Sequence, residues 1–429
     1  MEEYKESGID WIGKIPKKWE IQPLGVCFEE RREKVSDNDY EPLSVTKNGI
    51  VRQLENVAKS DAHDDRKKVC KDDFVINSRS DRKQSCGLSE YDGSVSLINI
   101  VLKVNKKLLE PAFVKYLLDN CMFAEEFYRN GHGIVADLWT TNYYEMKRIS
   151  VPIPSISEQT EIVRILNNNI PKINIILENL KKQIGILNNY KQSKITEVVT
   201  KGINPNVEYK ESGIDWIGRI PKKWNIKRIT NISSLKGRIG WQGLTTEEYI
   251  DEGPFLITGV DFNNGTIDWN NCVHVSEWRF KQAPEIQIKE GDLLITKDGT
   301  VGKVAITKNT PSKVTLNSGV LLIRPMKEKI YINKFIYYVI LSNEFWHWFD
   351  YINSGNTTII HLYQNVFAKF TFAIPDINEQ NEIVNYLDQE CKKIDETINI
   401  KQHQIEKLEN YKKSLIYEYV TGKKRVKGE

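Results

Sequence analysis

Two long stretches of the chain place apolar residues at alternating steps of four and three, the period at which one helix face meets a partner helix. In the first stretch these seam positions are Leu166, Ile170, Ile173, Leu177, Leu180, Ile184 and Leu187. In the second stretch they are Leu387, Cys391, Ile394, Ile398, Lys401, Ile405 and Leu408, of which only Lys401 is not apolar. The pattern predicts two long helices packed on each other. The alternative is two amphipathic helices that each lie on their own domain.

Both helical stretches open with a similar phrase: "IPSISEQTEIV" begins at Ile153 and "IPDINEQNEIV" begins at Ile374. A second phrase also occurs twice, as "YKESGIDWIGKIPKKWEI" from Tyr4 and as "YKESGIDWIGRIPKKWNI" from Tyr209. The stretches in between, 22–151 and 227–372, resemble each other little. The chain therefore consists of two halves with similar flanks and different middles.

The first helical stretch contains a proline, Pro171, directly after "NNNI". Proline is tolerated in the first turn of a helix and disrupts a helix interior. We therefore expect a kink or break near 168–172, with Asn169 or Ile170 capping a new helix. The second stretch has no proline at this place.

The middle stretches are predicted to be mixed α/β, because short apolar runs alternate with longer helical patterns. The strand-like runs are Leu43–Lys47, Asp73–Asn77, Val95–Val104, Phe255–Val260, Asp292–Thr296, Lys303–Thr307 and Val320–Arg324. The helix-like runs are Pro111–Arg129 and Ile332–Tyr351. The aromatic cluster "FWHWF" at 345–349 is interpreted as core rather than as a ligand platform.

Composition and charge limit the classes of protein that are compatible with this sequence. The 429 residues carry a net charge of +3 and no basic tail, so any nucleic-acid binding depends on how charge is arranged in space. The six cysteines are scattered without metal spacing, and no signal peptide or membrane span is apparent. These features predict a cytoplasmic protein with reduced thiols.

Reactive constellations are missing from the sequence. "GTVGKV" at 299–304 lacks the spacing of a phosphate-binding loop, and "GRIGWQG" at 237–243 lacks that of a dinucleotide fingerprint. No Asp/Asn-Pro-Pro-aromatic run of an amino-methyltransferase occurs, and the six histidines are isolated from one another. The sequence therefore favours a binding protein over a catalyst, without a metal site.

Five phrases together resemble the DNA-specificity subunit of type I restriction–modification systems. They are "SGIDWIGKIPKKW", "IPSISEQTEIV", "GWQGL", "GDLLITKDGTVGKVAI" and "NYKQSKITEVVTKG", and the likeness covers nearly the whole chain. It implies two α/β (α+β) target-recognition domains separated by two long helices packed as an antiparallel coiled coil, with a pseudo-twofold internal repeat. The predicted segments are a first recognition domain in 1–151, a central helical region in 152–204, a second recognition domain in 205–373 and a distal helical region in 374–429.

The resemblance also implies how the work is divided among subunits. This chain would carry no cofactor and no catalysis. Two methyltransferase subunits that bind S-adenosylmethionine would assemble on it, and restriction subunits (nuclease and translocase) using ATP and magnesium would join them on double-stranded DNA. A self-contained restriction or modification enzyme is one alternative, and a coiled-coil scaffold that does not bind DNA is the other.

A pseudo-twofold arrangement would give the repeated phrase a physical role. The second copy follows the first helix directly, whereas the first copy begins the sequence. We therefore expect the first copy to meet the end of the second helix, near Val420–Lys424. Four tryptophans would be buried as anchors at these two junctions: Trp11, Trp19, Trp216 and Trp224.

Polar loops between strands are the candidate DNA-binding residues, because their side chains can reach phosphates or base edges. In the first half they are Arg79, Arg82, Lys83 and Gln84. In the second half they are Lys236, Arg238, Trp241, Gln242, Lys297, Asp298, Thr300 and Lys303. Solvated hairpin turns are the alternative reading. Because the two domains differ, the predicted target is bipartite with two different half-sites.

Overall fold

The computed structural model describes residues 3–53, 64–133, 139–239, 243–353 and 361–426. The chain divides into two compact units: unit 1 comprises Met1–Lys181 and Gln402–Glu429, and unit 2 comprises Lys182–Lys401. Each unit thus combines one repeated phrase, one middle stretch, and parts of both long helices. The two helical regions do not form compact units of their own. Among the described residues, no helix is long and apolar enough to cross a membrane.

Unit 1 is built on a four-stranded antiparallel sheet in the order β10-β9-β12-β4, together with a three-stranded sheet β11-β8-β5. Its strands are β1 (Tyr4–Glu6), β2 (Lys14–Pro16), β3 (Glu20–Pro23), β4 (Phe28–Glu30), β5 (Lys34–Val35), β6 (Leu43–Thr46), β7 (Gly49–Arg52), β8 (Arg66–Val69), β9 (Phe74–Asn77), β10 (Cys86–Leu88), β11 (Gly93–Ser96), β12 (Asn99–Val104) and β13 (Ser150–Ile153). Its shorter helices are α1 (Leu24–Cys27), α2 (Pro111–Leu118), α3 (Cys121–Arg129) and α4 (Tyr143–Met146).

Unit 2 repeats this plan with a four-stranded sheet in the order β17-β25-β22-β23 and a three-stranded sheet β21-β18-β24. Its strands are β14 (Tyr209–Glu211), β15 (Arg219–Pro221), β16 (Asn225–Arg228), β17 (Ser233–Gly237), β18 (Ile250–Ile257), β19 (Phe262–Asn263), β20 (Thr266–Ile267), β21 (Val273–His274), β22 (Leu293–Thr296), β23 (Val304–Ile306), β24 (Val314–Leu316), β25 (Val320–Pro325) and β26 (Thr371–Ile374). Its shorter helices are α6 (Ile229–Ile232), α7 (Glu277–Lys281), α8 (Asn333–Leu341), α9 (Asn343–Asn353) and α10 (Gln364–Phe367).

Both faces of the unit 2 sheet are buried, which explains why β22 and β25 are apolar without alternation. Leu293 and Ile295 pack with α8 and α9 on one face, whereas Leu294 packs into a second core on the other face. Phe345 and Trp348 of the "FWHWF" cluster lie in the first of these cores. The prediction that this cluster is core is therefore confirmed.

The long helices are α5 (Ile156–Lys201) and α11 (Ile377–Val420). In unit 1, Lys412 Nζ donates to Asn174 Oδ1 at 2.8 Å. In unit 2, Lys191 Nζ contacts both carboxylate oxygens of Asp395 at 2.7 Å. Lys181 also contacts Glu409 in unit 1, and Gln183 contacts Lys401 in unit 2. Within each unit, residue numbers therefore fall along α11 as they rise along α5, so the helices are antiparallel there. This confirms the predicted antiparallel pair.

The seam positions lie on the less exposed face of both helices. Those that are buried are Leu166, Ile170, Ile173, Leu177, Leu387, Cys391, Ile394 and Ile405. Those that are half-buried are Leu180, Ile184, Leu187, Ile398, Lys401 and Leu408. Lys401 Nζ donates to Gln183 Oε1 at 2.7 Å, so this seam lysine ends in a polar contact with the opposite helix.

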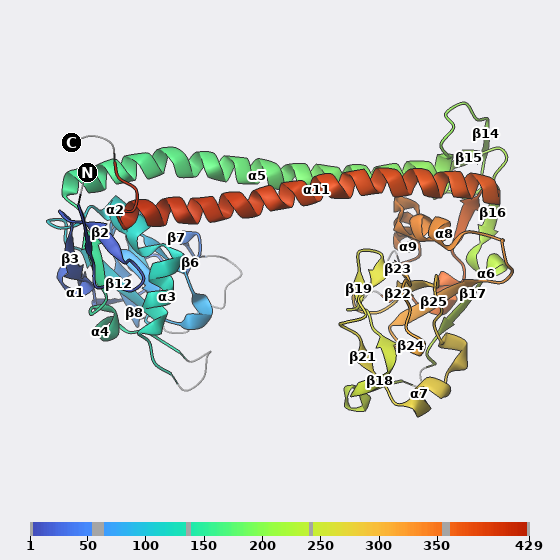
Figure 1. Cartoon of the computed structure of the whole chain (residues 1–429), viewed down its shortest axis with the longest axis horizontal. Coiled ribbons are helices and arrows are strands. Elements are labelled where there is room, and N and C mark those ends of the chain that lie inside the picture. The colour runs from blue at the N-terminus through green and yellow to red at the C-terminus, as the bar shows by residue number, and fades with distance from the viewer. Residues whose placement is uncertain (1–2, 54–63, 134–138, 240–242, 354–360, 427–429) are drawn as a thin grey trace. The chain divides into compact units, whose positions relative to one another are not determined.

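Of the kink or break expected near 168–172, the break with a new helix cap is wrong, because α5 continues through Pro171 without interruption (Figure 1). An internal proline costs about 3 kcal/mol. Ile170 and Ile173 are buried on either side of it, and Asn169 Nδ2 donates to the Ile165 carbonyl at 2.7 Å. Seam packing on both sides offsets the missing backbone hydrogen bond.

Three other predicted elements are each divided in two. The strand-like run 95–104 makes a turn between β11 and β12, and the helix-like runs 111–129 and 332–351 are α2 with α3 and α8 with α9. The helix breaks have a local cause. Asn120 caps α3 by accepting from the Phe123 amide at 2.9 Å, and Ser342 donates back to the Val339 carbonyl at 2.7 Å.

Candidate nucleic-acid interface

Two equivalent glutamines, one in each "EQ" pair, attach the domains to the long helices. Gln159 on α5 accepts from the Glu110 amide at 2.8 Å and donates to the Leu108 and Pro154 carbonyls. Gln380 on α11 accepts from the Ile332 amide at 2.9 Å and donates to the Pro375 carbonyl at 3.0 Å. Both side chains are buried. The start of α2 and the start of α8 are therefore fixed to a long helix in the same way.

The N-terminal phrase contacts the end of α11 inside unit 1, as expected from the repeat. Tyr417 Oη donates to the Trp11 carbonyl at 2.9 Å, and Lys423 Nζ donates to the Lys14 carbonyl at 2.6 Å. Trp19 Nε1 donates to Glu158 Oε1 at 3.2 Å. The phrase thus joins the domain, the start of α5 and the end of α11.

Three of the four predicted tryptophan anchors, Trp11, Trp19 and Trp224, are buried, and the fourth departs from the expectation. Trp216 is only half-buried, since it lies against the exposed ring of Tyr351 at a centroid distance of 5.4 Å. Its counterpart Trp11 instead packs edge-on against the fully buried Phe123. The different α3 and α9 surfaces account for the difference.

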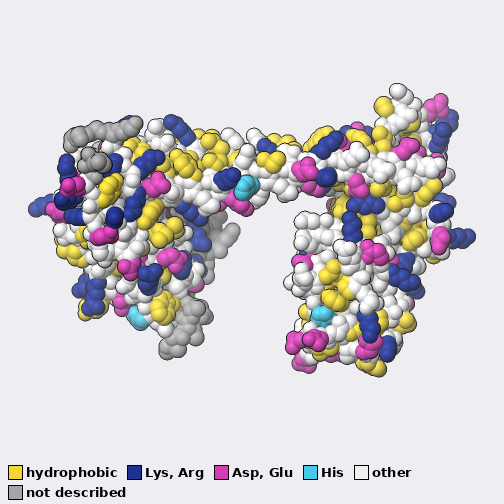
Figure 2. All heavy atoms as spheres, in the orientation of Figure 1, with side chains coloured by type: hydrophobic (Ala, Val, Ile, Leu, Met, Phe, Trp, Pro, Cys, Tyr) yellow, Lys and Arg dark blue, Asp and Glu magenta, His cyan; other side chains and the backbone are white. Residues whose placement is uncertain are grey.

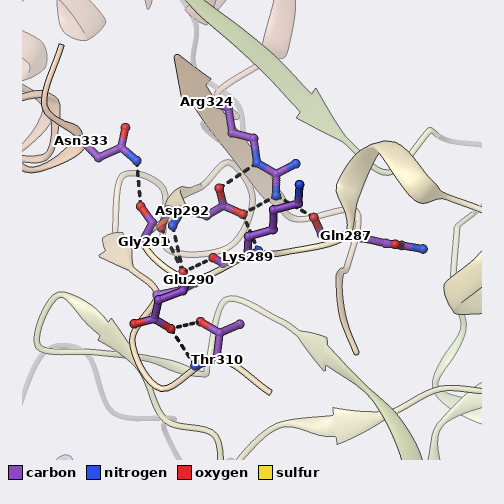
Figure 3. Close-up of polar contacts among 9 residues, drawn as sticks. Gln287, Lys289, Glu290, Gly291, Asp292, Thr310, Arg324 and Asn333 are labelled. Atoms are coloured by element: carbon purple, nitrogen blue, oxygen red, sulfur yellow. Dashed lines mark hydrogen bonds and ion pairs between the residues drawn. The ribbon is translucent and has the colours of Figure 1, made fainter. Parts of the chain in front are cut away.

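A buried carboxylate holds the turn that leads into the central strand of unit 2 (Figure 3). Asp292 accepts from the Lys289 amide at 2.7 Å and pairs with the Arg324 guanidinium, whose Nε lies 2.7 Å from Oδ1. Arg324 also donates to the Gln287 carbonyl at 2.7 Å, and Asn333 on α8 donates to the Gly291 carbonyl at 2.7 Å. Strand β22 therefore begins directly after a turn that these contacts hold in place.

Unit 1 has an equivalent pair of a buried aspartate and an arginine at the start of β9. Asp73 accepts from the Cys70 amide at 2.8 Å and from Arg31 Nε at 2.7 Å. Asp72, which precedes it, has a φ of 69°, where unit 2 has Gly291 with a φ of 79°. The two domains share this framework although their sequences differ.

The loop Thr296–Lys303 follows β22 and carries four of the predicted DNA-binding residues. Thr296 Oγ1 accepts from the Lys303 amide at 2.9 Å and donates to the Thr300 carbonyl, which closes the loop on itself. Lys297 and Asp298 are half-buried and Thr300 is exposed. Asp298 Oδ1 lies 2.7 Å from His361 Nδ1, so a histidine that was considered isolated in the sequence belongs to this surface.

The other candidates of unit 2 separate into three cases. Lys236 is exposed on β17. Arg238 is buried at 3% exposure, and its guanidinium donates to the Leu316 carbonyl at 2.8 Å and to Thr315 Oγ1 at 3.0 Å. Burial there lowers the pKa of Arg238. This position does not support the predicted contact of Arg238 with DNA, because the guanidinium is engaged inside the domain. Trp241 and Gln242 lie outside the described residues.

The four candidates of unit 1 lie together on the loop between β9 and β10. Arg79, Arg82 and Lys83 are exposed, and Gln84 is half-buried with a φ of 62°. A left-handed backbone is uncommon at a non-glycine residue, so Gln84 gives this loop a specific shape. The loop is also paired with a second segment, since an antiparallel bridge joins Arg79 to Thr140.

The second segment is the part of the surface that the sequence did not reveal. In unit 1 it brings Trp139 next to the loop, where its amide carbonyl accepts from the Ser80 amide at 3.0 Å. In unit 2 the corresponding segment contains His361 and Leu362, whose amide donates to the Lys297 carbonyl at 3.0 Å. Sequence distance hides this pairing, because both segments lie about 60 residues beyond the loops that they contact.

Charge on this surface is mixed rather than concentrated. Lys83 pairs with Glu125 at 3.0 Å, and Arg82 lies 3.7 Å from Asp81. Figure 2 shows lysine, arginine, aspartate and glutamate side chains interspersed over the drawn face of both units. Among the described residues, no three His, Cys, Asp or Glu side chains form a group that could hold a metal ion. The arrangement fits recognition by individual side chains on rigid loops.

Residues 221–410 match the model of the type I restriction modification DNA specificity domain. A Methanocaldococcus jannaschii chain assigned as the MjaX specificity subunit of a type I restriction enzyme is 25% identical, over 99% of this chain and 98% of its own length. The EcoBI specificity subunit of Escherichia coli is 22% identical over 56% of this chain and 51% of its own length.

Solved structures share the fold. A chain from a study of complex assembly and conformational transition of the type I R-M system has a TM-score of 0.73 at 16% identity, covering 95% of this chain and 98% of that one. The HsdS subunit of Thermoanaerobacter tengcongensis has a TM-score of 0.52 at 16% identity, covering 97% and 99%. In its duplicated domains, antiparallel helices and repeated flanks, this chain is similar to the DNA-specificity subunits of type I restriction–modification systems.

Proposed function

We propose that this chain is the non-catalytic DNA-specificity and assembly subunit of a type I restriction–modification complex, and that each unit reads one half of a bipartite, asymmetric target. One observation carries the proposal: the two units share a framework, from Gln159 and Gln380 to Asp73 and Asp292, but present different loops on it. Similar frameworks suit identical partners, and different loops suit different half-sites.

The long helices offer a surface for the partner subunits, which we propose are two methyltransferases that bind S-adenosylmethionine. Several large apolar side chains on α5 and α11 face solvent, including Ile186 at 66% exposure and Ile400 at 61%. Tyr190 and Tyr411 occupy equivalent positions of the repeat and are 50% and 52% exposed. Exposed aromatic and apolar side chains of this kind favour protein association. Restriction subunits using ATP and magnesium would join the same complex in the cytoplasm.

Methylome sequencing of a host that expresses this chain with its methyltransferase subunits tests the proposal. Methylated adenines should fall within one two-part motif with an unread gap, and the methylation should disappear when this chain is left out. Methyl transfer by this chain alone would instead support a self-contained enzyme. A complex that methylates no defined motif would support a scaffold without DNA recognition.

A further inference from the structure

Val260 is the most exposed of the large hydrophobic side chains among the described residues, with 75% of its surface accessible. A single exposed apolar residue is ordinary on a protein surface. Val260 differs from such a residue, because hydrogen bonds to a buried carboxylate fix the backbone of the turn that carries it.

The carboxylate of Asp261 fixes this turn. Asp261 is buried at 1% exposure, and its Oδ2 accepts from the Thr258 amide at 2.6 Å and from Thr258 Oγ1 at 2.9 Å. Asn271 Nδ2 donates to the other oxygen at 3.3 Å. The Val260 side chain is thus projected into solvent from a backbone with little freedom, so contact with a ligand would cost little ordering entropy.

The turn adjoins the predicted DNA-binding loop. Lys303 Nζ donates to the Gly259 carbonyl at 3.3 Å, and a Cβ placed on Gly259 would lie 3.6 Å from the Thr296 methyl group. Val260 therefore stands beside Lys303 and the loop that begins at Thr296, at the surface where unit 2 presents its polar side chains.

Unit 1 also has an exposed turn after a strand, between β6 and β7, and it carries a residue of different chemistry. This residue is Asn48, whose amide donates to Thr46 Oγ1 at 3.1 Å. Asparagine can hydrogen-bond an adenine edge, whereas an apolar side chain can contact the thymine methyl group.

We propose that Val260 contacts a thymine 5-methyl group in the half-site read by unit 2 and thereby selects a T·A pair at one position. The inference rests on the proposed function and adds a specificity-determining residue to it. The proposed contact is purely apolar, so it should be lost when the base carries no 5-methyl group.

The test uses the complex of the full chain with its methyltransferase subunits. The half-site of unit 2 is identified by exchanging 227–372, and each of its thymines is then replaced singly by uracil, which lacks the methyl group. One replacement should weaken binding by the unaltered complex by about fourfold, the value expected for one buried methyl group at about 0.8 kcal/mol. The Val260→Ala complex should show a smaller difference between the two duplexes, because alanine lacks the two γ carbons of valine, and its methylated motif should be relaxed at that position alone.

Ile250→Ala is the matched control, since Ile250 is an exposed apolar residue at the opposite end of the same strand. It should leave the motif and the response to uracil unchanged. Equal behaviour of Val260→Ala and the unaltered chain toward uracil would overturn the inference while the proposed function stands. A unit 2 half-site that contains no thymine would also overturn the inference and leave the proposed function standing. A complex that reads no motif at all would overturn both.

Discussion

At the scale of single residues, Glu344 and Gln84 allow stability and recognition to be tested separately. Glu344 on α9 is buried at 4% exposure, and one carboxylate oxygen has no hydrogen-bond partner. Gln84 has a left-handed backbone on the predicted DNA-binding loop of unit 1. The first residue affects the free energy of folding, and the second affects the shape of the predicted DNA-binding loop.

Burial raises the pKa of Glu344 to about 8, well above its ordinary value of 4.5. The folded state therefore holds this proton more tightly than the unfolded chain, so stability should fall as pH rises from about 4.5 through 8. The loss should be on the order of a few kcal/mol. Thermal unfolding of Glu344→Gln should show a smaller loss of melting temperature across this range. The same decline in both chains would contradict the assignment, and Glu382→Gln, altered at an exposed site, is the control.

Gln84→Gly should separate stability from recognition. Glycine removes a left-handed cost of roughly 1–2 kcal/mol but loses more entropy on folding, so the net change in unfolding free energy should stay within about 1 kcal/mol. Methylation at the half-site read by unit 1 should nevertheless weaken, because the side chain is gone. Lys329→Gly, at an exposed residue with a φ of 60° in unit 2, is the control and should methylate normally. Unchanged methylation by Gln84→Gly would remove Gln84 from the interface.

At the scale of elements, the pattern predicted the long helices well and their surroundings less well. Periodicity marked the buried seam, because burial along a helix pair imposes its period directly on the sequence. It could not show that α5 runs through Pro171, since that outcome depends on packing by Ile170 and Ile173 on both sides. It also merged α2 with α3, because the stop at Asn120 depends on a side-chain cap rather than on hydrophobicity.

The candidate site shows the same limit. The loop Thr296–Lys303 was predicted from its glycines and charges. The sequence could not show that His361 and Val260 lie beside this loop, because both come from distant parts of the chain. His361 contacts Asp298, and the turn that carries Val260 is fixed by the buried Asp261 and contacts Lys303. Arg238 was predicted on the surface from its charge, and its burial against Thr315 depends on tertiary contacts alone.

Leu177→Lys tests the seam. Leu177 is buried at 8% exposure, and an unpaired charge there should destabilise the chain by roughly 3 kcal/mol, measured as a fall in melting temperature. Ile186→Lys introduces the same residue on the same helix at 66% exposure and should leave the melting temperature of the free chain unchanged. Equal melting temperatures for both variants would argue against a packed seam at Leu177.

At the scale of the whole molecule, the repeated flanks and the different middles have separate tasks. The flanks close each unit by joining a domain to the ends of both long helices, as Tyr417 does at Trp11 and Gln159 does at Glu110. The middles supply the loops. This division explains why similar phrases recur from Tyr4 and Tyr209 while 22–151 and 227–372 differ.

The exposed helix tyrosines test the assembly half of this division. Tyr190→Glu and Tyr411→Glu should each weaken association with the methyltransferase subunits, and the double variant should abolish the full complex, measured by mass photometry of the co-expressed proteins. Tyr144→Glu, at an exposed tyrosine of the unit 1 domain, should assemble normally. Normal assembly of the double variant would place the partner surface elsewhere.

The central claim is that each unit reads its own half-site on a common framework. Exchanging 227–372 for the corresponding stretch of a relative with a different target, followed by methylome sequencing with the same methyltransferase subunits, tests it most directly. The account predicts that the complex still assembles and methylates, that one half-site changes to that of the relative, and that the other half-site stays as it was. A change in both half-sites, or an unchanged motif from an active complex, would contradict it.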